Sequence, residues 1–119
     1  KNTYLTVPVN IERPELLGLF ETTGFTEAYF VDDDGKLLGK TKVNSILSNG
    51  SVNLIEDKNP LYIEKSSNIS DAIIKISNFV GESVPVVDTN QVLKGVVTES
   101  DLFLEYLKVQ DKISEIEKD

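Results

Sequence analysis

The stretch Gly95-Val96-Val97-Thr98-Glu99-Ser100-Asp101 decides how the chain is organised, because it joins a buried strand to a helix. Residues 92–97 are mostly apolar, which is typical of a strand inside a protein. Thr98 followed three residues later by the acid Asp101 is the pattern of a capping box, so a helix is predicted to begin here. This helix is predicted over 101–108, with apolar side chains on one face, namely Leu102, Phe103, Tyr106 and Leu107.

The residues before this stretch complete a unit of strand, helix, strand, strand and helix. Leu61-Tyr62-Ile63 predicts the first, short strand. Ser70 is the predicted N-cap of a helix with Asp71 in its first turn, where a negative charge favours the positive end of the helix dipole. The apolar face of that helix is predicted over 72–80. Val84-Pro85-Val86-Val87 predicts the next strand, with its proline near the start, where the ladder needs no donor.

The same unit occurs twice, because shifting the sequence by 56 positions aligns it with itself without a gap. Identical residues mark the alignment at Leu5 and Leu61, Val31 and Val87, Asp32 and Asp88, Leu37 and Leu93, and Gly39 and Gly95. We therefore expect a first repeat over 1–50 and a second over 51–119, with a connector near 48–51. A unit of about 50 residues is small for a core of its own. The repeats are predicted to pack into one α+β module around a shared core.

The first repeat shows the same elements in a more diverged form. Its first helix is predicted to begin near Pro14 and to stop near Gly24. Two apolar strands then flank Asp33-Asp34-Gly35, which is a strong signal for a hairpin turn. The run Asp32-Asp33-Asp34 has the carboxylates of a divalent cation loop, but it lacks the downstream Gly and Glu of an EF-hand. A solvated turn is the favoured interpretation, and no metal site is predicted.

Composition limits the functions that the chain can perform. Its 119 residues include no cysteine and no histidine, which removes the usual nucleophile, general base and transition-metal ligand. We therefore expect no enzymatic activity and no required cofactor. A net charge of −8 argues against binding nucleic acid or anionic lipid.

Membrane insertion is not expected either, because no apolar run approaches the roughly 20 residues of a membrane span. The absence of cysteine suits a reducing compartment, so a cytoplasmic location is the expectation. The chain begins at Lys1 without a methionine, and we expect it to be a piece of a longer protein.

The chain resembles a pair of CBS domains, the repeats named for their occurrence in cystathionine β-synthase. Ser83-Val84-Pro85-Val86-Val87-Asp88 is similar to the apolar-proline strand of that family. The stretch from Gly95 to Leu102 is similar to its Gly-apolar-apolar-Thr-x-x-Asp segment. The resemblance implies that the repeats join through their sheets around a pseudo-twofold axis. It also implies clefts for a regulatory ligand, which would be AMP, ADP, ATP or S-adenosylmethionine.

The resemblance implies roles for four residues of the second repeat. Asp101 would accept hydrogen bonds from ribose hydroxyls, and Thr98 would face the phosphates. Val84 and Pro85 would border the base. The chemistry is suitable, because a carboxylate accepts two hydroxyl donors and a helix N-terminus offers amides to phosphate. However, capping alone also explains Thr98 and Asp101, and a strand start also explains Pro85.

The first repeat departs from the family pattern, so at most one nucleotide site is expected. Lys42 and Ser45 stand where the second repeat has its threonine and aspartate, and the ribose-binding carboxylate is therefore missing. Tyr29 and Phe30 replace the apolar-proline strand and are predicted to lie in the core or to fill the matching cleft. Lys40 and Lys42 either reach phosphates across the pseudo-axis or form a solvated pair at a strand end. The solvated pair is the favoured interpretation.

The leading hypothesis is a cytosolic regulatory module that binds an adenosine nucleotide in the second-repeat cleft and controls an attached domain or partner. The alternative is a ligand-free dimerisation module with both clefts filled. A homodimer through the repeats is expected, and Ile113 and Ile116 add a weak apolar stripe for a partner. The stretch 101–107 and the charged helix after it resemble the cytosolic tail of ClC-type chloride channels and transporters. A stand-alone CBS-pair protein is the alternative parent.

Overall fold

The structure is a computed structural model that describes residues 3–48, 53–77, 79 and 83–117. The first repeat contains the elements β1 (Leu5–Pro8), α1 (Arg13–Thr23), β2 (Glu27–Val31), β3 (Leu37–Lys42) and α2 (Val43–Ser48). The second contains β4 (Ile63–Glu64), α3 (Ile69–Ile76), β5 (Val84–Val87), β6 (Leu93–Val97) and α4 (Glu99–Glu117). The predicted α+β class and the predicted order of elements in each repeat are therefore confirmed. The predicted connector lies largely outside the described residues.

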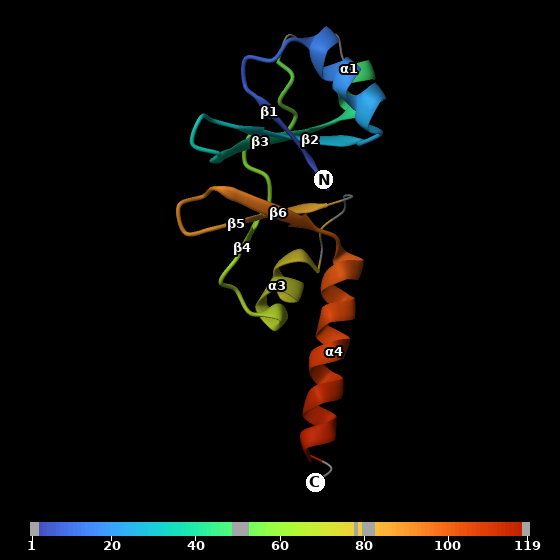
Figure 1. The fold of residues 1–119 in the computed structure, drawn as a ribbon, viewed down its shortest axis with the longest axis vertical. Coiled ribbons are helices and arrows are strands. Elements are labelled where there is room, and N and C mark those ends of the chain that lie inside the picture. The colour runs from blue at the N-terminus through green and yellow to red at the C-terminus, as the bar shows by residue number, and fades with distance from the viewer. Residues whose placement is uncertain (1–2, 49–52, 78, 80–82, 118–119) are drawn as a thin grey trace.

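The two repeats form two three-stranded sheets of identical topology. In each sheet the first strand runs parallel to the second, and the second pairs antiparallel with the third. The sheets face each other, and the helices cover their outer faces (Figure 1). Within the described part of the chain, none of the helices combines the length and apolarity needed to cross a membrane.

The prediction of one shared core is wrong, because each repeat buries its own apolar cluster. The first cluster includes Leu16, Phe20 and Phe30, and the second includes Ile76 and Val84. Each cluster combines side chains from a sheet with those from the helices of the same repeat. The layer between the two sheets contains polar and charged side chains instead, and these are described with the site below.

Local sequence signals explain where α1 and the first hairpin turn. Gly24 has a φ of 77°, which favours glycine, and its N–H donates to Phe20 O at 2.9 Å. Gly35 in the hairpin has a φ of 82°. Asp32 Oδ1 accepts the N–H groups of Asp34 and Lys36, each at 2.9 Å. These observations confirm both the predicted helix end and the predicted turn.

The two hairpin turns meet at Lys36 and Val92, which are 56 positions apart and form an antiparallel bridge. The N–H of Leu37 donates to Gln91 O, and the N–H of Leu93 donates to Gly35 O, both at 3.0 Å. Gln91 has a φ of 68°, close to that of Gly35. The irregular pairing between Phe30 and Val31 also recurs 56 positions later. The two repeats are therefore related by a pseudo-twofold axis that passes between their turns.

Two helix predictions in the second repeat require correction. The N-cap of α3 is Asn68 and not Ser70, because Asn68 Oδ1 accepts the N–H of Asp71 at 2.8 Å. Asn is as good an N-cap as Ser, and this choice still places Asp71 in the first turn as predicted. The helix ends at Ile76, so it stops before residue 80, the predicted end of its apolar face. Residue 80 itself lies outside the described part of the chain.

The apolar face predicted for α4 is only partly buried. Leu102 is buried, but Phe103 and Leu107 are 55% and 42% exposed. The helix α4 has 19 residues and α3 has eight, so α4 extends well beyond its neighbour (Figure 1). Phe103 lies in the part of α4 beside α3, and it is exposed all the same.

The segment after the connector crosses the edge of β3 in the first repeat. Lys40 and Asp57 exchange two backbone hydrogen bonds of 2.9 and 3.0 Å. A Cβ atom at Gly39 would lie 2.6 Å from Ile55 Cγ2 and 2.9 Å from Asp57 O. Glycine is therefore required at position 39 for this close approach. At Gly95, the equivalent position, a Cβ atom would meet no described atom within 4 Å.

Candidate functional site in the cleft between the repeats

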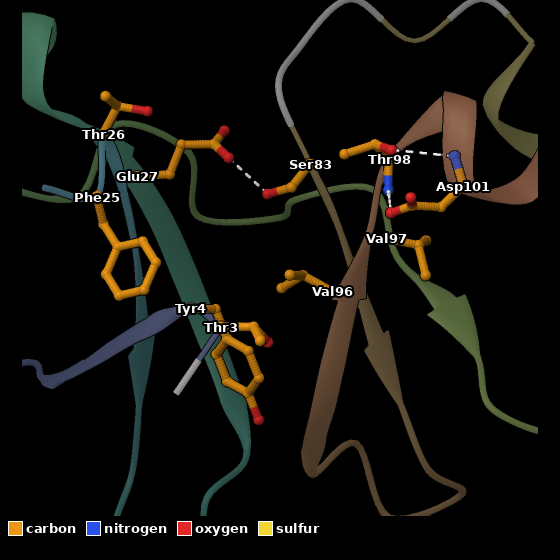
Figure 2. A pocket seen from close by; sticks show the side chains of 10 residues that line it. All are labelled: Thr3, Tyr4, Phe25, Thr26, Glu27, Ser83, Val96, Val97, Thr98 and Asp101. Atoms are coloured by element: carbon orange, nitrogen blue, oxygen red, sulfur yellow. Dashed lines mark hydrogen bonds between the residues drawn. The ribbon is translucent and has the colours of Figure 1, made fainter. Parts of the chain in front are cut away.

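A cleft of about 340 Å³ lies between the end of β6 in one repeat and the start of β2 in the other. Its size falls in the usual range for small-molecule sites. The cleft is lined by Thr3, Tyr4, Phe25, Thr26, Glu27, Ser83, Val96, Val97, Thr98 and Asp101. Figure 2 shows residues of the first repeat on one side and residues of the second on the other.

The structure brings Thr98 and Asp101 together at the cleft, as a reciprocal capping box. The N–H of Thr98 donates to Asp101 Oδ2 at 3.1 Å, and the N–H of Asp101 donates to Thr98 Oγ1 at 3.1 Å (Figure 2). The predicted start of α4 is therefore confirmed. Capping uses one carboxylate oxygen and leaves Asp101 Oδ1 available as an acceptor. It also leaves the hydroxyl proton of Thr98 available as a donor.

Val84 and Pro85 occupy a different environment from Thr98 and Asp101. Both side chains are fully buried, and neither lines the cleft. Val84 belongs to the apolar cluster of the second repeat, and Pro85 pairs with Val96 in the sheet. They support the strand beside the cleft wall. That they border a base remains a prediction.

Glu27 is a buried carboxylate on the first-repeat side of the cleft, and the sequence analysis missed it. It is only 8% exposed. Its Oε1 accepts a hydrogen bond from Ser83 Oγ at 2.5 Å, and its Oε2 lies 2.7 Å from Lys40 Nζ. Glu27 and Ser83 are 56 positions apart, so they face each other across the pseudo-twofold axis. That spacing was present in the sequence, but nothing in it indicated contact between equivalent positions.

Lys40 is buried between the sheets, so a solvated strand-end pair is the wrong interpretation for this residue. Only 6% of it is exposed. Besides its ion pair with Glu27, Nζ donates to the backbone oxygen of Ser83 at 2.7 Å. Nζ also lies 5.5 Å from the ring centroid of Tyr29 and 5.3 Å from that of Phe79. A carboxylate, a carbonyl and two ring faces replace the water that this ammonium loses on burial.

Tyr29 completes the polar layer between the sheets. Its hydroxyl lies 2.5 Å from Ser83 Oγ. Because Ser83 donates its only hydroxyl proton to Glu27, Tyr29 is the donor in this contact. Burial raises the pKa of the Tyr29 hydroxyl, and the Glu27 charge adds to this rise. Tyr29 and Phe30 are both buried, as predicted.

A second cleft, of about 290 Å³, occupies the pseudo-equivalent place on the other side of the axis. Lys40 and Lys42 line it, at the positions equivalent to Val96 and Thr98. Tyr29 and Phe30 are not among its lining residues, so these aromatics do not fill it. At the position equivalent to Asp101, the hydroxyl of Ser45 donates to Glu56 Oε2 at 2.5 Å. The two clefts therefore differ in their chemistry.

Comparison with known proteins finds a family match within the second repeat. Residues 53–108 match the sequence model of the CBS domain. No curated protein sequence matches the chain. The fold, however, is similar to several solved structures that are each under 25% identical in sequence. Three of these are described next.

CBSX2 of Arabidopsis thaliana, solved with AMP, shares 21% identity with a TM-score of 0.73, over 91% of this chain and 90% of that one. The CBS domain pair of protein MJ0100, solved with 5′-methylthioadenosine and S-adenosyl-L-methionine, shares 23% identity with a TM-score of 0.71, over 89% and 93%. The cytosolic domain of the Mg²⁺ channel MgtE, solved with ATP, shares 18% identity with a TM-score of 0.73, over 84% and 44%. Residues 53–108 therefore match the CBS domain in sequence, and the chain has the fold of a CBS-domain pair.

Proposed function

We propose that the chain is a regulatory module that senses an adenosine-containing ligand in the cleft beside Thr98 and Asp101. One observation carries the proposal. Polar groups with unused hydrogen-bonding capacity on the second repeat face aromatic side chains of the first repeat across a cleft of about 340 Å³. CBS pairs of the same fold have been solved with AMP and with S-adenosyl-L-methionine, which supports this class of ligand.

The cleft offers separate surfaces for a purine and a sugar. Tyr4 and Phe25 on one side and Val96 and Val97 on the other form apolar walls suited to a flat base (Figure 2). Asp101 Oδ1 is available to accept a hydrogen bond from a ribose hydroxyl. In this arrangement the base lies between the repeats, and the ribose lies at the start of α4.

Ligand binding in this cleft would change how the two repeats are arranged relative to each other, because both repeats supply walls of the cleft. A ligand shifts a conformational equilibrium only by its difference in affinity for the two states. Contacts to both repeats provide such a difference, since they are complete in one arrangement only. An attached domain or a partner would then respond to the arrangement of the repeats.

The test is a binding titration with AMP, ADP, ATP and S-adenosylmethionine, comparing the native chain with Asp101→Asn. The asparagine oxygen can still accept the Thr98 N–H, so the cap is preserved while the second acceptor oxygen is lost. Affinity should fall roughly 10- to 100-fold, as for the loss of a hydrogen bond to a charged group. Ser45→Ala, at the equivalent position of the first repeat, is the control and should change little.

Two results would count against this proposal. Unchanged affinity in Asp101→Asn would remove Asp101 from the site. If no adenosine ligand shifts the unfolding temperature at saturating concentration, a ligand-free dimerisation module would be favoured instead.

The exposed apolar side chains of the second repeat support self-association as a further part of the proposal. Ile74 on α3 and Phe103 and Leu107 on α4 are all large and exposed. Grouped apolar side chains at a protein surface commonly mark an interface. We propose a homodimer through these helices, and sedimentation of the native chain and of Phe103→Glu distinguishes a dimer from a monomer.

We also propose a cytoplasmic membrane-transport context, with a ClC-type chloride channel or transporter as the attached effector. The sequence resemblance of 101–107 supports the ClC type. The Mg²⁺ channel MgtE provides a cytosolic domain of the same fold, and this chain spans 44% of the MgtE structure. The full-length reading frame tests the idea. A frame without membrane spans would exclude this effector and favour a stand-alone CBS-pair protein.

A further inference from the structure

We infer that this cleft selects adenosine ligands whose 5′ substituent is neutral or cationic, such as a thioether or a sulfonium, over those with a 5′ phosphate. The inference rests on the proposed function, because it concerns the ligand of the same cleft. It rests on the charges of the cleft walls and on the capping box, which already uses the amides of Thr98 and Asp101 at the start of α4.

The walls of the cleft are acidic. Its described lining residues include the carboxylates of Glu27 and Asp101 and no lysine or arginine. Glu27 is neutralised locally by Lys40 at 2.7 Å, whereas Asp101 has only hydrogen bonds to backbone within the capping box. Glu99 is exposed in the same helical turn and adds a second negative charge there. Among the described residues that line the cleft, a phosphate would therefore meet like charge and no cationic side chain.

The start of α4 offers less to an anion than a free helix N-terminus does. A phosphate at a helix start is held by free backbone amides and by the positive end of the helix dipole. Here the amides of Thr98 and Asp101 both donate within the capping box. The carboxylate of Asp101 also compensates the dipole at the place where a phosphate would bind. A neutral or cationic substituent needs neither of these groups.

Two described lysines of the neighbouring strands, Lys40 and Lys94, have other partners. Lys40 is held by Glu27 and the Ser83 carbonyl, and it lines the second cleft together with Lys42. Lys94, on the same strand as Val96, lies 3.9 Å from Asp88 beside the hairpin turn. The second cleft therefore holds the lysines that a phosphate would need, and the first cleft holds the carboxylate that a ribose would need.

The experiment measures the dissociation constants of 5′-methylthioadenosine, S-adenosylmethionine, AMP and ATP for the native chain by calorimetry. Methylthioadenosine and S-adenosylmethionine should bind at least about 10-fold more tightly than AMP, and ATP should bind most weakly; a factor of 10 corresponds to about 1.4 kcal/mol. Raising the salt from low to about 0.5 M should reduce this discrimination, because salt screens exposed charges.

Glu99→Lys is the matched variant, since Glu99 is exposed and lies outside the lining of the cleft. It should strengthen AMP binding several-fold and leave methylthioadenosine binding unchanged, with circular dichroism to verify the fold. Equal affinities, or tighter binding of AMP or ATP, would overturn the charge selection and leave the adenosine site itself intact. Absence of binding by all four ligands would overturn the proposed function and this inference together.

Discussion

The two repeats have the same topology but present different chemistry to each other. Where the first repeat has Glu27 and Lys40, the second has Ser83 and Val96 at the equivalent positions. The first repeat therefore contributes a buried ion pair to the layer between the sheets. The second contributes a small hydroxyl, a backbone carbonyl and apolar surface.

This difference shows how a pseudo-symmetric pair can have unlike clefts. Two identical repeats would place the same side chains on both sides of the axis and create two equal sites. Here the charged pair of the first repeat lies between the clefts, with Glu27 lining one and Lys40 lining the other. Only the cleft on the Glu27 side contains Thr98 and Asp101. The divergence of the sequences has therefore produced one cleft with a carboxylate at the start of a helix and one with lysines.

The largest expected effect comes from breaking the charged pair of the first repeat with Lys40→Ala. This change leaves Glu27 buried without its cation, which typically costs about 3–5 kcal/mol. Urea unfolding of the native chain and the variant measures the loss. Lys42→Ala, two residues further along the same face of β3, is the control and should lie within about 0.5 kcal/mol of the native chain.

A loss below about 1 kcal/mol for Lys40→Ala would mean that water reaches Glu27 more readily than its 8% exposure indicates. The double variant Glu27→Gln with Lys40→Met removes both charges. It should be more stable than Lys40→Ala, because no uncompensated charge then remains.

An intermediate effect is expected when the two equivalent glycines are compared. In Gly39→Ala the new methyl group meets Ile55 and the backbone of Asp57, so the segment after the connector must shift. Overpacking of this kind costs about 1–3 kcal/mol. Gly95→Ala places its methyl group where no described atom lies within 4 Å, and it should change stability by less than about 0.5 kcal/mol. Similar losses of unfolding free energy in the two variants would contradict the close contact of Ile55 and Asp57 with Gly39.

The smallest effect is expected at alkaline pH, from Tyr29. Burial raises the pKa of this hydroxyl, so the unfolded chain loses the proton at a lower pH than the folded protein does. The stability that Tyr29 contributes is therefore complete below the ordinary tyrosine pKa and is lost as the pH rises from there towards the raised pKa of the folded state. Tyr29→Phe should lose stability less steeply above roughly pH 10. Equal slopes of unfolding free energy against pH would show that Tyr29 ionises freely in the folded state.

Local signals in the sequence predicted local structure well. Gly24, the Asp33-Asp34-Gly35 turn and the Thr98–Asp101 box each act within a few residues, and each has its predicted structure. The choice of Asn68 over Ser70 shows the limit of such signals, because two good N-caps stand two residues apart. Packing, and not propensity, decides between neighbouring caps.

Contacts between the repeats could not be predicted from the same signals. Lys40 has the sequence of a solvated strand end, and only the opposing sheet provides the carbonyl and the ring that make its burial possible. Likewise the sequence places Leu102 and Phe103 on one apolar face of α4, and the structure buries only Leu102. Both outcomes depend on a partner surface that is distant in sequence.

The backbone hydrogen bonds between the two hairpin turns have a mechanical consequence. Leu37 with Gln91, and Leu93 with Gly35, tie the repeats together at one end of their sheets. The proposed ligand cleft lies at the opposite end, where β2 begins and β6 ends. A rotation of one repeat against the other about the turns would therefore be largest at the cleft, and there it is opposed by the hydrogen bonds that join Ser83 to Glu27 and to Lys40.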